Sequence, residues 1–145
     1  MTIAVGFVGL GRIGKPIAAN ILAAGFDLMV FDVREEPMRE LAQLGAKQAS
    51  GLRDLSEHAE IIGVAVVDDS QVEEVVLSDA GLLQNGRRKS IIMIHSTVMP
   101  GTVRKLAQAG QGKGVTVVDA PVSGGEAGAR ERQTVLYGWR GERCF

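Results

Sequence analysis

The stretch from the N-terminus to Asp32 limits what this chain can fold into more than any other. A short apolar run over residues 3–8 leads into a glycine-rich loop, residues 9–14, after which apolar residues recur at helical spacing. A second apolar run, residues 28–31, ends at Asp32. This order predicts a buried strand, a tight turn, a helix and a second parallel strand. It is typical of dinucleotide binding, although a purely structural βαβ turn is the alternative.

Each glycine of the loop has its own expected task. Gly9 permits the tight turn, Gly11 lets a pyrophosphate approach the backbone, and Gly14 lets the helix lie close to the strand. The N-terminus of the helix offers free N–H groups and a partial positive charge to the phosphates. The predicted phosphate-binding loop comprises Gly9, Leu10, Gly11, Arg12, Ile13 and Gly14.

Asp32, Val33 and Arg34 follow the second strand and are predicted to contact the cofactor. The Asp32 carboxylate can accept hydrogen bonds from the adenosine ribose and would repel a 2′-phosphate, which favours NAD. Arg34 could pair with that phosphate, so NADP is the alternative. Asp32 could instead cap the following helix, but its place at the end of a strand favours the ribose contact.

Strand and helix patterns alternate through the rest of the chain. The predicted strands cover residues 46–49, 60–67, 90–94 and 115–118, and the predicted helices cover 35–44, 50–59, a segment after 68–70, and 100–111. The alternation predicts an α/β fold, a Rossmann-type, doubly wound and mainly parallel sheet with helices on both faces. Ligands of such sheets bind beyond the carboxyl ends of the strands.

Local patterns predict details of the helices. Met38, Leu41 and Leu44 recur every three residues and predict one apolar face on the helix over 35–44. Ser50 is an expected N-cap of the next helix, and Asp68 or Asp69 is the expected cap of the helix that follows.

Composition narrows the class of protein. The 145 residues suffice for one domain, and a formal net charge of −1 gives no case for nucleic acid or membrane partners. The single cysteine, Cys144, cannot form an intrachain disulfide, which fits a reducing compartment. No signal-peptide pattern, bilayer-length apolar stretch or metal site is found, so we expect a cytoplasmic protein.

Three stretches together resemble the β-hydroxyacid dehydrogenases, a family that includes 3-hydroxyisobutyrate dehydrogenase, tartronate semialdehyde reductase and the nucleotide domain of 6-phosphogluconate dehydrogenase. The first is the opening segment 6–22, which looks like the N-terminal signature of that family. Residues 96–100 look like its Ser-Thr-x-x-Pro loop, and residues 119–125 look like its substrate loop, the most specific of the three. The resemblance covers residues 1 to 130.

The resemblance implies roles for residues at other strand ends. Val66 and Val67 would border the cofactor, although the family usually carries Leu-Pro there, and Thr97 would lie by the nicotinamide. Thr97 and the glycines of the substrate loop could instead serve as turn residues. The substrate carboxylate would be held by Ser123, Gly124 and Gly125.

The resemblance also implies hydride transfer between a nicotinamide and a 3-hydroxy acid, with a lysine as general acid and base. The lysine motif of the family and its helical second domain would lie beyond Phe145, so no catalytic residue is assigned here. Lys105 and Lys113 do not have the spacing to replace that lysine. His58 is expected to be solvated, and His95 could face the cofactor, although a packed, hydrogen-bonded histidine is the commoner case.

We expect residues 1–130 to form the dinucleotide-binding domain and residues 131–145 an atypical tail. Codons for Gly138-Trp139-Arg140-Gly141-Glu142, read one base over, can spell the Val-Gly-Gly-Glu turn of the family. A truncated or frame-shifted dehydrogenase is therefore one hypothesis, and a short protein with its own terminus is the other.

The function expected is that of the NAD(P)-binding part of an oxidoreductase for a small 3-hydroxy acid such as 3-hydroxyisobutyrate. This chain alone is expected to bind cofactor without turnover. The alternatives are a stand-alone NAD-binding or sensing module, and a relative of 6-phosphogluconate dehydrogenase or imine reductase. Without a helical domain, apolar surface around residues 120–145 could support self-association into a homo-oligomer.

Overall fold

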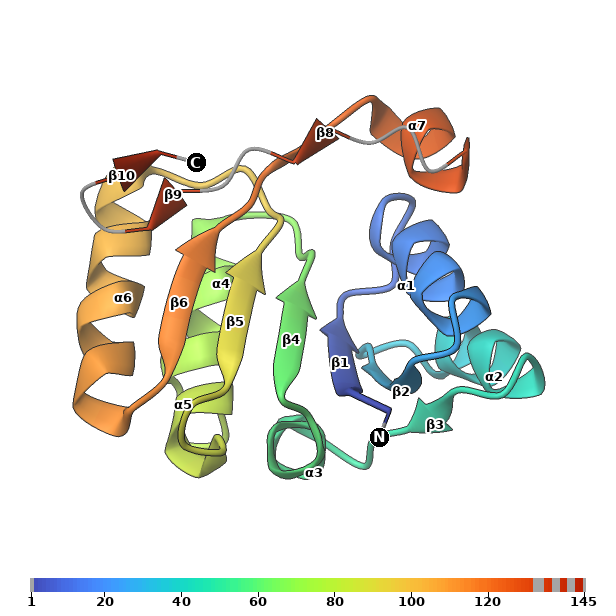
Figure 1. Ribbon diagram of the computed structural model, residues 1–145, viewed down its shortest axis with the longest axis horizontal. Coiled ribbons are helices and arrows are strands. Elements are labelled where there is room, and N and C mark those ends of the chain that lie inside the picture. Colours follow the sequence, from blue (N-terminus) through green and yellow to red (C-terminus); the bar gives the residue numbers. More distant parts are fainter. Residues whose placement is uncertain (1, 132–134, 137–138, 141–142, 145) are drawn as a thin grey trace.

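A computed structural model describes residues 2–131, 135–136, 139–140 and 143–144. Within these residues a parallel sheet has the strand order β6-β5-β4-β1-β2-β3 (Figure 1). Its strands are β1 (Ala4–Val8), β2 (Asp27–Phe31), β3 (Lys47–Gln48), β4 (Ile61–Val64), β5 (Ile91–Ile94) and β6 (Thr116–Asp119). This order reverses between β1 and β4, as in a doubly wound Rossmann fold, so the predicted fold class is confirmed.

Short antiparallel strands adjoin the parallel sheet near the C-terminus. β9 (Trp139–Arg140) pairs with β6 and with β10 (Arg143–Cys144), while β7 (Val122–Ser123) pairs with β8 (Val135–Leu136) in a separate ribbon. The segment expected to form an atypical tail, residues 131–145, thus contains short strands, and its remaining residues from 132 on lie outside those described.

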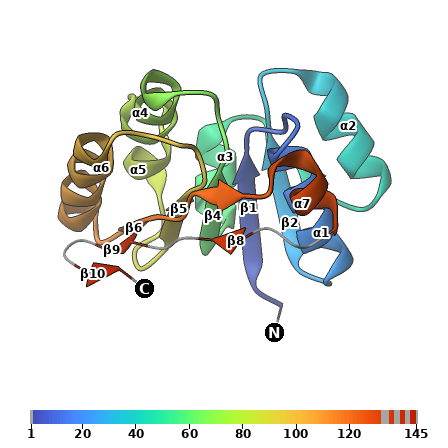
Figure 2. The same cartoon turned by 90° about the horizontal axis from the view of Figure 1, so that it is seen from above.

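Helices pack on both faces of the sheet (Figure 2). They are α1 (Gly14–Ala23), α2 (Glu35–Gln43), α3 (Leu52–His58), α4 (Asp69–Leu77), α5 (Leu82–Asn85), α6 (Pro100–Lys113) and α7 (Gly125–Glu131). The sequence did not predict α5 or α7. Helix α5 spans only about one turn. Helix α7 contains Gly125 and Gly128, and glycine disfavours helix.

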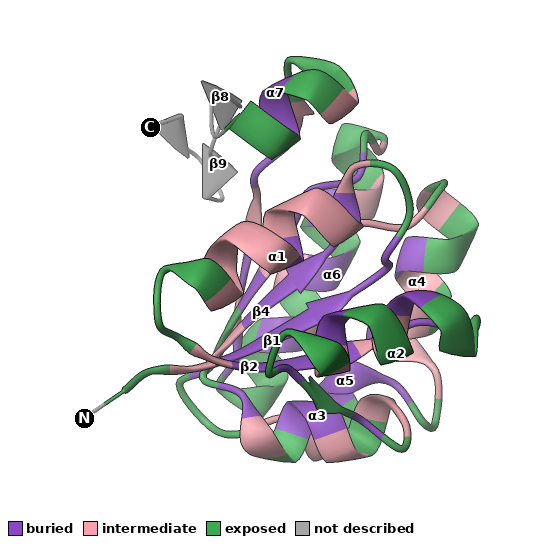
Figure 3. Cartoon of the chain, turned by 90° about the vertical axis from the view of Figure 1, so that its right-hand side faces the viewer, coloured by how far each residue is buried: buried purple, intermediate pink, exposed green. Residues whose placement is uncertain are grey.

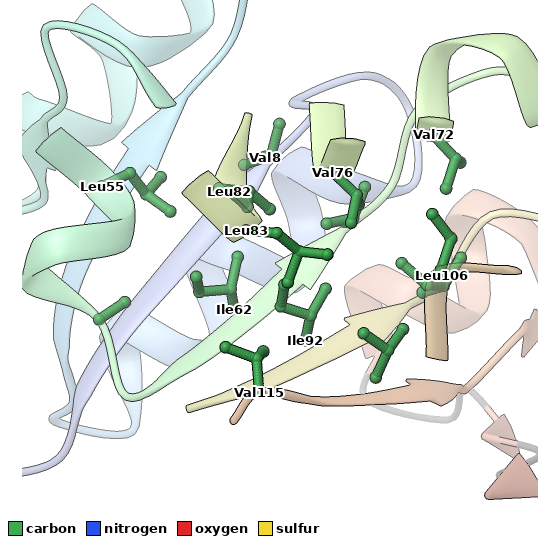
Figure 4. Packing of buried hydrophobic residues seen from close by; sticks show 14 of the residues in the cluster. Val8, Leu55, Ile62, Val72, Val76, Leu82, Leu83, Ile92, Leu106 and Val115 are labelled. Carbon is green, nitrogen blue, oxygen red and sulfur yellow. The ribbon is translucent and has the colours of Figure 1, made fainter. Parts of the chain in front are cut away.

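Side chains of β1 alternate between two apolar clusters, one on each face of the sheet. Phe7 belongs to the cluster under α1 and α2, whereas Val8 belongs to the larger cluster under α3 to α6. Figure 4 shows the larger cluster, in which Leu55, Val76 and Leu106 come from three different helices. The buried strands lie between exposed outer helix faces in Figure 3. The clusters hold the strand ends rigidly in register, so the loops after them form one fixed rim.

Two local predictions for the helices are wrong. Leu44 is 68% exposed because α2 ends at Gln43 and Gly45 then turns the chain with a φ of +112°. Ser50 does not cap α3, since its hydroxyl instead donates to Asp54 Oδ2 at 3.1 Å. The Asp54 carboxylate also accepts from the N–H of Ser50 at 2.9 Å, so Ser50 is a donor to the first turn of α3 and not its cap.

The cap of α4 is confirmed, and it reveals a tie to α6. Asp68 accepts a hydrogen bond from the N–H of Gln71 at 2.9 Å. Asp69 accepts from Thr102 Oγ1 at 2.6 Å and from the N–H of Met99 at 2.9 Å. The hydrogen bond from Thr102, followed by that from Met99, lowers the pKa of the Asp69 carboxyl. Asp68 thus caps α4, and Asp69 joins the start of α4 to the start of α6.

His58 is not solvated as expected. Its side chain is 18% exposed, and Nε2 lies 3.5 Å from Asp27 Oδ2 at the edge of the sheet opposite the glycine loop. Lys47 Nζ also contacts Asp27, at 2.9 Å. His58 is the last residue of α3, and β4 begins three residues later at Ile61. No helix in the described part of the chain is long and apolar enough to cross a bilayer.

Candidate nucleotide-binding site

The glycine loop joins β1 to α1 in a conformation that its three glycines make possible. Gly9 has a φ of +91°, and its N–H donates to the carbonyl of Phe31 at 3.0 Å. A Cβ at Gly14 would overlap the carbonyl oxygen of Gly9, so α1 could not approach β1 this closely with any other residue. A Cβ at Gly11 would meet nothing within 4 Å. The space beside Gly11 is therefore open, where a pyrophosphate would need it.

The N-terminus of α1 faces this open space without a side-chain cap. Ile13 occupies the N-cap position, and its apolar side chain cannot accept a hydrogen bond from the first turn. Uncapped N–H groups and the helix dipole together favour an anion. The loop thus supplies both room and donors for phosphate groups.

Asp32 ends β2 and is bound to the glycine loop. Its Oδ2 accepts from the N–H of Leu10 at 2.7 Å, and its Oδ1 accepts from the N–H of Arg34 at 2.8 Å. Burial would raise the pKa of this carboxyl, but the hydrogen bonds from Arg34 and Leu10 outweigh it and hold the pKa below its usual value of 3.8. Asp32 is therefore a charged group at the centre of the rim, and both of its carboxylate oxygens already accept hydrogen bonds.

Arg34 folds back over this carboxylate. Its Nε lies 3.3 Å from Asp32 Oδ1, and Nη2 donates to the carbonyl of Leu10 at 3.2 Å. The bond from the N–H of Arg34, which is the N-cap residue of α2, means that Asp32 also supports the start of that helix. Asp32 does not cap α2 itself, because no side chain among the described residues accepts a hydrogen bond from the first turn of that helix.

A cleft of about 700 Å³ opens beside Asp32, between the ends of β1, β2 and β4 and the start of α4. Its walls include the predicted Gly9, Gly11, Val66 and Val67. Val33 is 94% exposed and Val67 81% exposed, so both present apolar surface at the mouth of the cleft. The cleft is also lined by residues that the sequence did not single out, namely Leu52, Gln71, Glu74, Val75 and Ser78.

These missed residues share a detectable pattern. Gln71, Glu74, Val75 and Ser78 are spaced by three and four, so they form one stripe along α4. The stripe lies beside the apolar face of α4, from which Val72 and Val76 pack into the larger cluster. Among them, Gln71 Oε1 accepts from the N–H of Val67 at 3.1 Å, which fixes the segment after β4.

A second cavity, of about 340 Å³, lies on the other side of the glycine loop. Thr97 lines it together with Val66, Val67 and Ser96 from the ends of β4 and β5. Ser96 Oγ accepts from the N–H of Val66 at 2.9 Å and donates to the carbonyl of Val66 at 2.7 Å. This buried hydroxyl joins the two strand ends that lie between the cleft and the cavity. Arg12, Ile13 and Gly14 complete the wall on the loop side.

His95 also lines the second cavity, but as a packed residue. It is 8% exposed, its Nδ1 lies 2.9 Å from the carbonyl oxygen of Ala120, and its ring stacks on Phe7. Burial lowers the pKa of His95 from its usual value of 6.5, and the bond to Ala120 opposes this in part. His95 is thus a packed, hydrogen-bonded histidine, and its ring also lines the second cavity.

The predicted substrate loop lies beside this cavity at the start of α7. Gly124 has a φ of +103° and Gly125 a φ of +60°, conformations that favour glycine. Gly125 lines the cavity, whereas Ser123 and Gly124 lie exposed outside its wall. Asn20 of α1 donates to the carbonyl of Ala129 at 2.7 Å, which ties α7 beside α1 (Figure 1). Asn20 lies in the segment 6–22 that resembles the signature of the family, and its hydrogen bond to α7 helps to position the predicted substrate loop.

A third cavity, of about 550 Å³, lies between α1, α2 and α7. Its charged walls are largely paired, since Lys15 contacts Glu40 and Arg130 lies 2.6 Å from Glu126. No group of three His, Cys, Asp or Glu side chains in the described ranges is arranged to hold a metal ion.

Comparisons with known proteins point to one family. The family described as the NAD binding domain of 6-phosphogluconate dehydrogenase matches residues 4–143. A 3-hydroxyisobutyrate dehydrogenase of Pseudomonas aeruginosa is 40% identical over 126 residues, which cover 87% of this chain and 42% of that protein. The chain spans about half the length of the curated relatives it matches.

Solved structures give the same picture. The crystal structure of 3-hydroxyisobutyrate dehydrogenase from Salmonella typhimurium has a TM-score of 0.88 at 28% identity, covering 94% of this chain and 47% of that one. The protein Psf3, solved in complex with NADP+, has a TM-score of 0.90 at 29% identity, covering 95% of this chain and 49% of that one.

Proposed function

This chain belongs to the family of the NAD-binding domain of 6-phosphogluconate dehydrogenase, and we propose that it is the cofactor-binding part of an oxidoreductase that acts on a small 3-hydroxy acid. Residues 1–130 would form the binding domain. The observation that carries this proposal is the arrangement of cleft, glycine loop and second cavity along one rim of the sheet.

The rim can accommodate an extended dinucleotide in one orientation. The pyrophosphate would lie on the loop from Gly9 to Gly14, and the adenosine in the cleft beside Asp32, Val33 and Arg34. The nicotinamide half would then lie in the second cavity, beside Thr97. Val66 and Val67 border both spaces, so they would contact the middle of the cofactor.

The nicotinamide would supply the hydride acceptor or donor when the cofactor is bound, while the residues of this chain would bind and orient it. Ser123, Gly124 and Gly125 lie next to the second cavity and offer a hydroxyl and backbone N–H groups to a substrate carboxylate. No lysine lines that cavity in the part of the chain that the structure describes. Lys105 is paired with Glu73 at 2.9 Å on α6, which supports binding without turnover by this chain alone.

We assign NAD as the preferred cofactor and NADP as the alternative. The low pKa of Asp32 keeps a negative charge where a 2′-phosphate would lie. Arg34 already interacts with this carboxylate and with Leu10, so it would have to leave both to serve a phosphate. The structural neighbour Psf3 binds NADP+, which is why the alternative is retained.

Calorimetric titration with NAD and NADP tests the assignment. Asp32→Asn keeps an acceptor for the N–H of Leu10 but removes the charge, so the preference for NAD should fall by about tenfold or more. Asp32→Ala removes both the charge and the tie to the loop, and should weaken binding of both cofactors. An unchanged NAD preference in Asp32→Asn, or full NAD affinity in Asp32→Ala, would remove Asp32 from cofactor recognition.

Turnover is tested by following NADH absorbance with 3-hydroxyisobutyrate as substrate. We expect binding of NAD without hydride transfer, and a measurable rate would show that the chain supplies its own general base. Supplementing the chain with a separately expressed helical domain of a relative gives a positive control for the assay.

A stand-alone NAD-binding or sensing module is the second candidate function. The absence of a lysine around the second cavity, within the described residues, favours it. The two candidates differ in one measurable property, because a sensing module should bind NAD with no effect of a hydroxy acid. The cofactor half of a dehydrogenase should bind a carboxylate beside Ser123, so that the hydroxy acid and NAD strengthen each other's binding. A 6-phosphogluconate or imine substrate would keep the cofactor site and fail this test with 3-hydroxyisobutyrate.

Association with further chains belongs to the same proposal. Relatives are about twice as long as this chain, and apolar surface near its C-terminal part could bring copies together. Light scattering after gel filtration measures this directly, and a monomer at all concentrations would contradict it.

A further inference from the structure

The imidazole of His95 is held in one orientation by two contacts. Its Nδ1 lies 2.9 Å from the carbonyl oxygen of Ala120, and its ring is stacked on Phe7 with 5.8 Å between the ring centroids and 10° between the planes. A carbonyl oxygen accepts hydrogen bonds and cannot donate them, so Nδ1 must carry the proton. In the neutral ring Nε2 is therefore the nitrogen with the lone pair.

The surroundings keep this ring neutral. Burial lowers the pKa of His95, and the side chain is 8% exposed. Gly63 lies so close that a Cβ there would approach Nε2 to 3.2 Å. No hydrogen-bond partner of Nε2 occurs among the described residues. Nε2 therefore presents a free lone pair at the wall of the cavity, where a ligand can supply the donor.

The position of His95 indicates which part of a dinucleotide can supply that donor. His95 follows β5, which is separated from the glycine loop after β1 by β4, so it lies about 10 Å across the sheet from the loop. A ribose attached to the pyrophosphate lies nearer to the loop than this, whereas the nicotinamide ring reaches farther. The N–H donors of that ring belong to its carboxamide.

We propose that Nε2 of His95 accepts a hydrogen bond from the carboxamide of the nicotinamide ring and so sets the rotation of the ring in the second cavity. This inference rests on the proposed function, because it assigns a partner within the same site. His95 is a positioning residue in this role, since it would contact the cofactor away from the carbon that exchanges the hydride.

Cofactor analogues test the proposal in the wild-type chain. Calorimetry would compare NAD with its 3-acetylpyridine analogue, in which a methyl group replaces the carboxamide nitrogen, and with its thionicotinamide analogue, which keeps the nitrogen. ADP-ribose, which lacks the ring, is the control for the adenosine half. We expect the acetylpyridine analogue to bind about tenfold more weakly than NAD, and the thionicotinamide analogue to bind within about twofold of it.

Two variants then assign the effect to one nitrogen. In His95→Asn the side-chain amide can still donate to Ala120, but nothing replaces Nε2, so NAD and the acetylpyridine analogue should bind equally. In His95→Gln the longer amide can place its oxygen near the position of Nε2, so at least part of the preference should return. Melting temperatures and ADP-ribose affinities of both variants show whether the site is intact.

The outcomes separate this inference from the proposed function. If ADP-ribose and NAD bind but the acetylpyridine analogue binds as tightly as NAD to the wild type, the role of His95 is wrong and the nucleotide site stands. A preference that persists in His95→Asn has the same meaning, and would point to another acceptor for the carboxamide. If neither NAD nor ADP-ribose binds to the wild type, the proposed function is overturned and this inference with it.

Discussion

At the scale of single residues, the glycines of one loop differ in what surrounds them. Gly14 is packed against the backbone of Gly9, whereas Gly11 faces open space. Both positions fit the same sequence motif, so the motif alone does not separate a glycine needed for folding from one needed for binding. The structure makes that distinction because it places neighbouring atoms around each Cα.

This difference predicts opposite effects of one methyl group. Gly14→Ala should destabilise the fold by about 1–3 kcal/mol, because the new Cβ overlaps the carbonyl of Gly9. Gly11→Ala should leave the free energy of unfolding nearly unchanged and weaken NAD binding by about tenfold or more. Urea unfolding and calorimetry measure the two quantities. Normal NAD affinity in Gly11→Ala would mean that the pyrophosphate does not approach this residue.

His95 predicts how stability depends on pH. Burial lowers its pKa in the folded state below 6.5, so the unfolded chain binds a proton more readily than the folded one. The contribution of His95 to stability is therefore complete above pH 6.5 and is lost as the pH falls through the folded-state pKa. The free energy of unfolding should fall on acidification from pH 7 to pH 5, and it should fall less in His95→Asn. Equal slopes in both proteins would show that His95 does not cause the pH dependence.

At the scale of elements, two neighbouring carboxylates at the start of α4 have different tasks, and one of them joins α4 to α6. Asp68 caps its own helix, while Asp69 accepts hydrogen bonds from Thr102 and Met99. Because α4 also lines the cleft and α6 begins just after Thr97, these contacts hold the two sides of the rim together.

Removing the cap gives a prediction for α4. Asp68→Ala should lower the free energy of unfolding by about 1 kcal/mol, because the N–H of Gln71 loses its acceptor. Asp79→Ala is a matched control, since Asp79 is an exposed carboxylate just beyond the same helix. Urea denaturation of both variants measures the difference, and equal stabilities would show that solvent replaces the cap without cost.

At the scale of the whole molecule, the rim joins segments that are distant in sequence. The glycine loop, Asp32, Thr97 and Gly125 lie on different elements. The strand order β2-β1-β4-β5 places Asp32, the glycine loop and Thr97 along one edge of the sheet in that order. A ligand that contacts all of them would link both apolar clusters of the sheet. Its binding should therefore stabilise the fold as a unit.

This gives a prediction for thermal unfolding. NAD at about 100 times its dissociation constant should stabilise the chain by about 2.7 kcal/mol, which corresponds to a rise of roughly 5–15 °C in the melting temperature. Nicotinamide mononucleotide, which lacks the adenosine half, should produce a smaller rise at the same concentration. A melting temperature that NAD leaves unchanged at every concentration would contradict the proposed site.

The sequence by itself determined the fold class and the order of the main elements. Strands of four or five apolar residues and helices with a repeating apolar face carry periodic signals that survive without tertiary context. The tight glycine turn and the place of Asp32 at the end of β2 were also predictable, because a tight turn and a strand end restrict residue type locally. The boundaries shifted where the signal was local and weak, as at Leu44, which lies one residue beyond α2.

Tertiary structure decided what the periodic signals do not contain. The stripe of Gln71, Glu74 and Ser78 faces the cleft because α4 forms one of its walls and the end of β2 another, and these segments are distant in sequence. The ion-pair geometry of His58 with Asp27 and the fixed tautomer of His95 depend on neighbours 25 or more residues away, such as Ala120 for His95. Local sequence sets which conformations a segment prefers, whereas burial, cavity walls and pKa shifts arise from atoms that meet when the segments pack together.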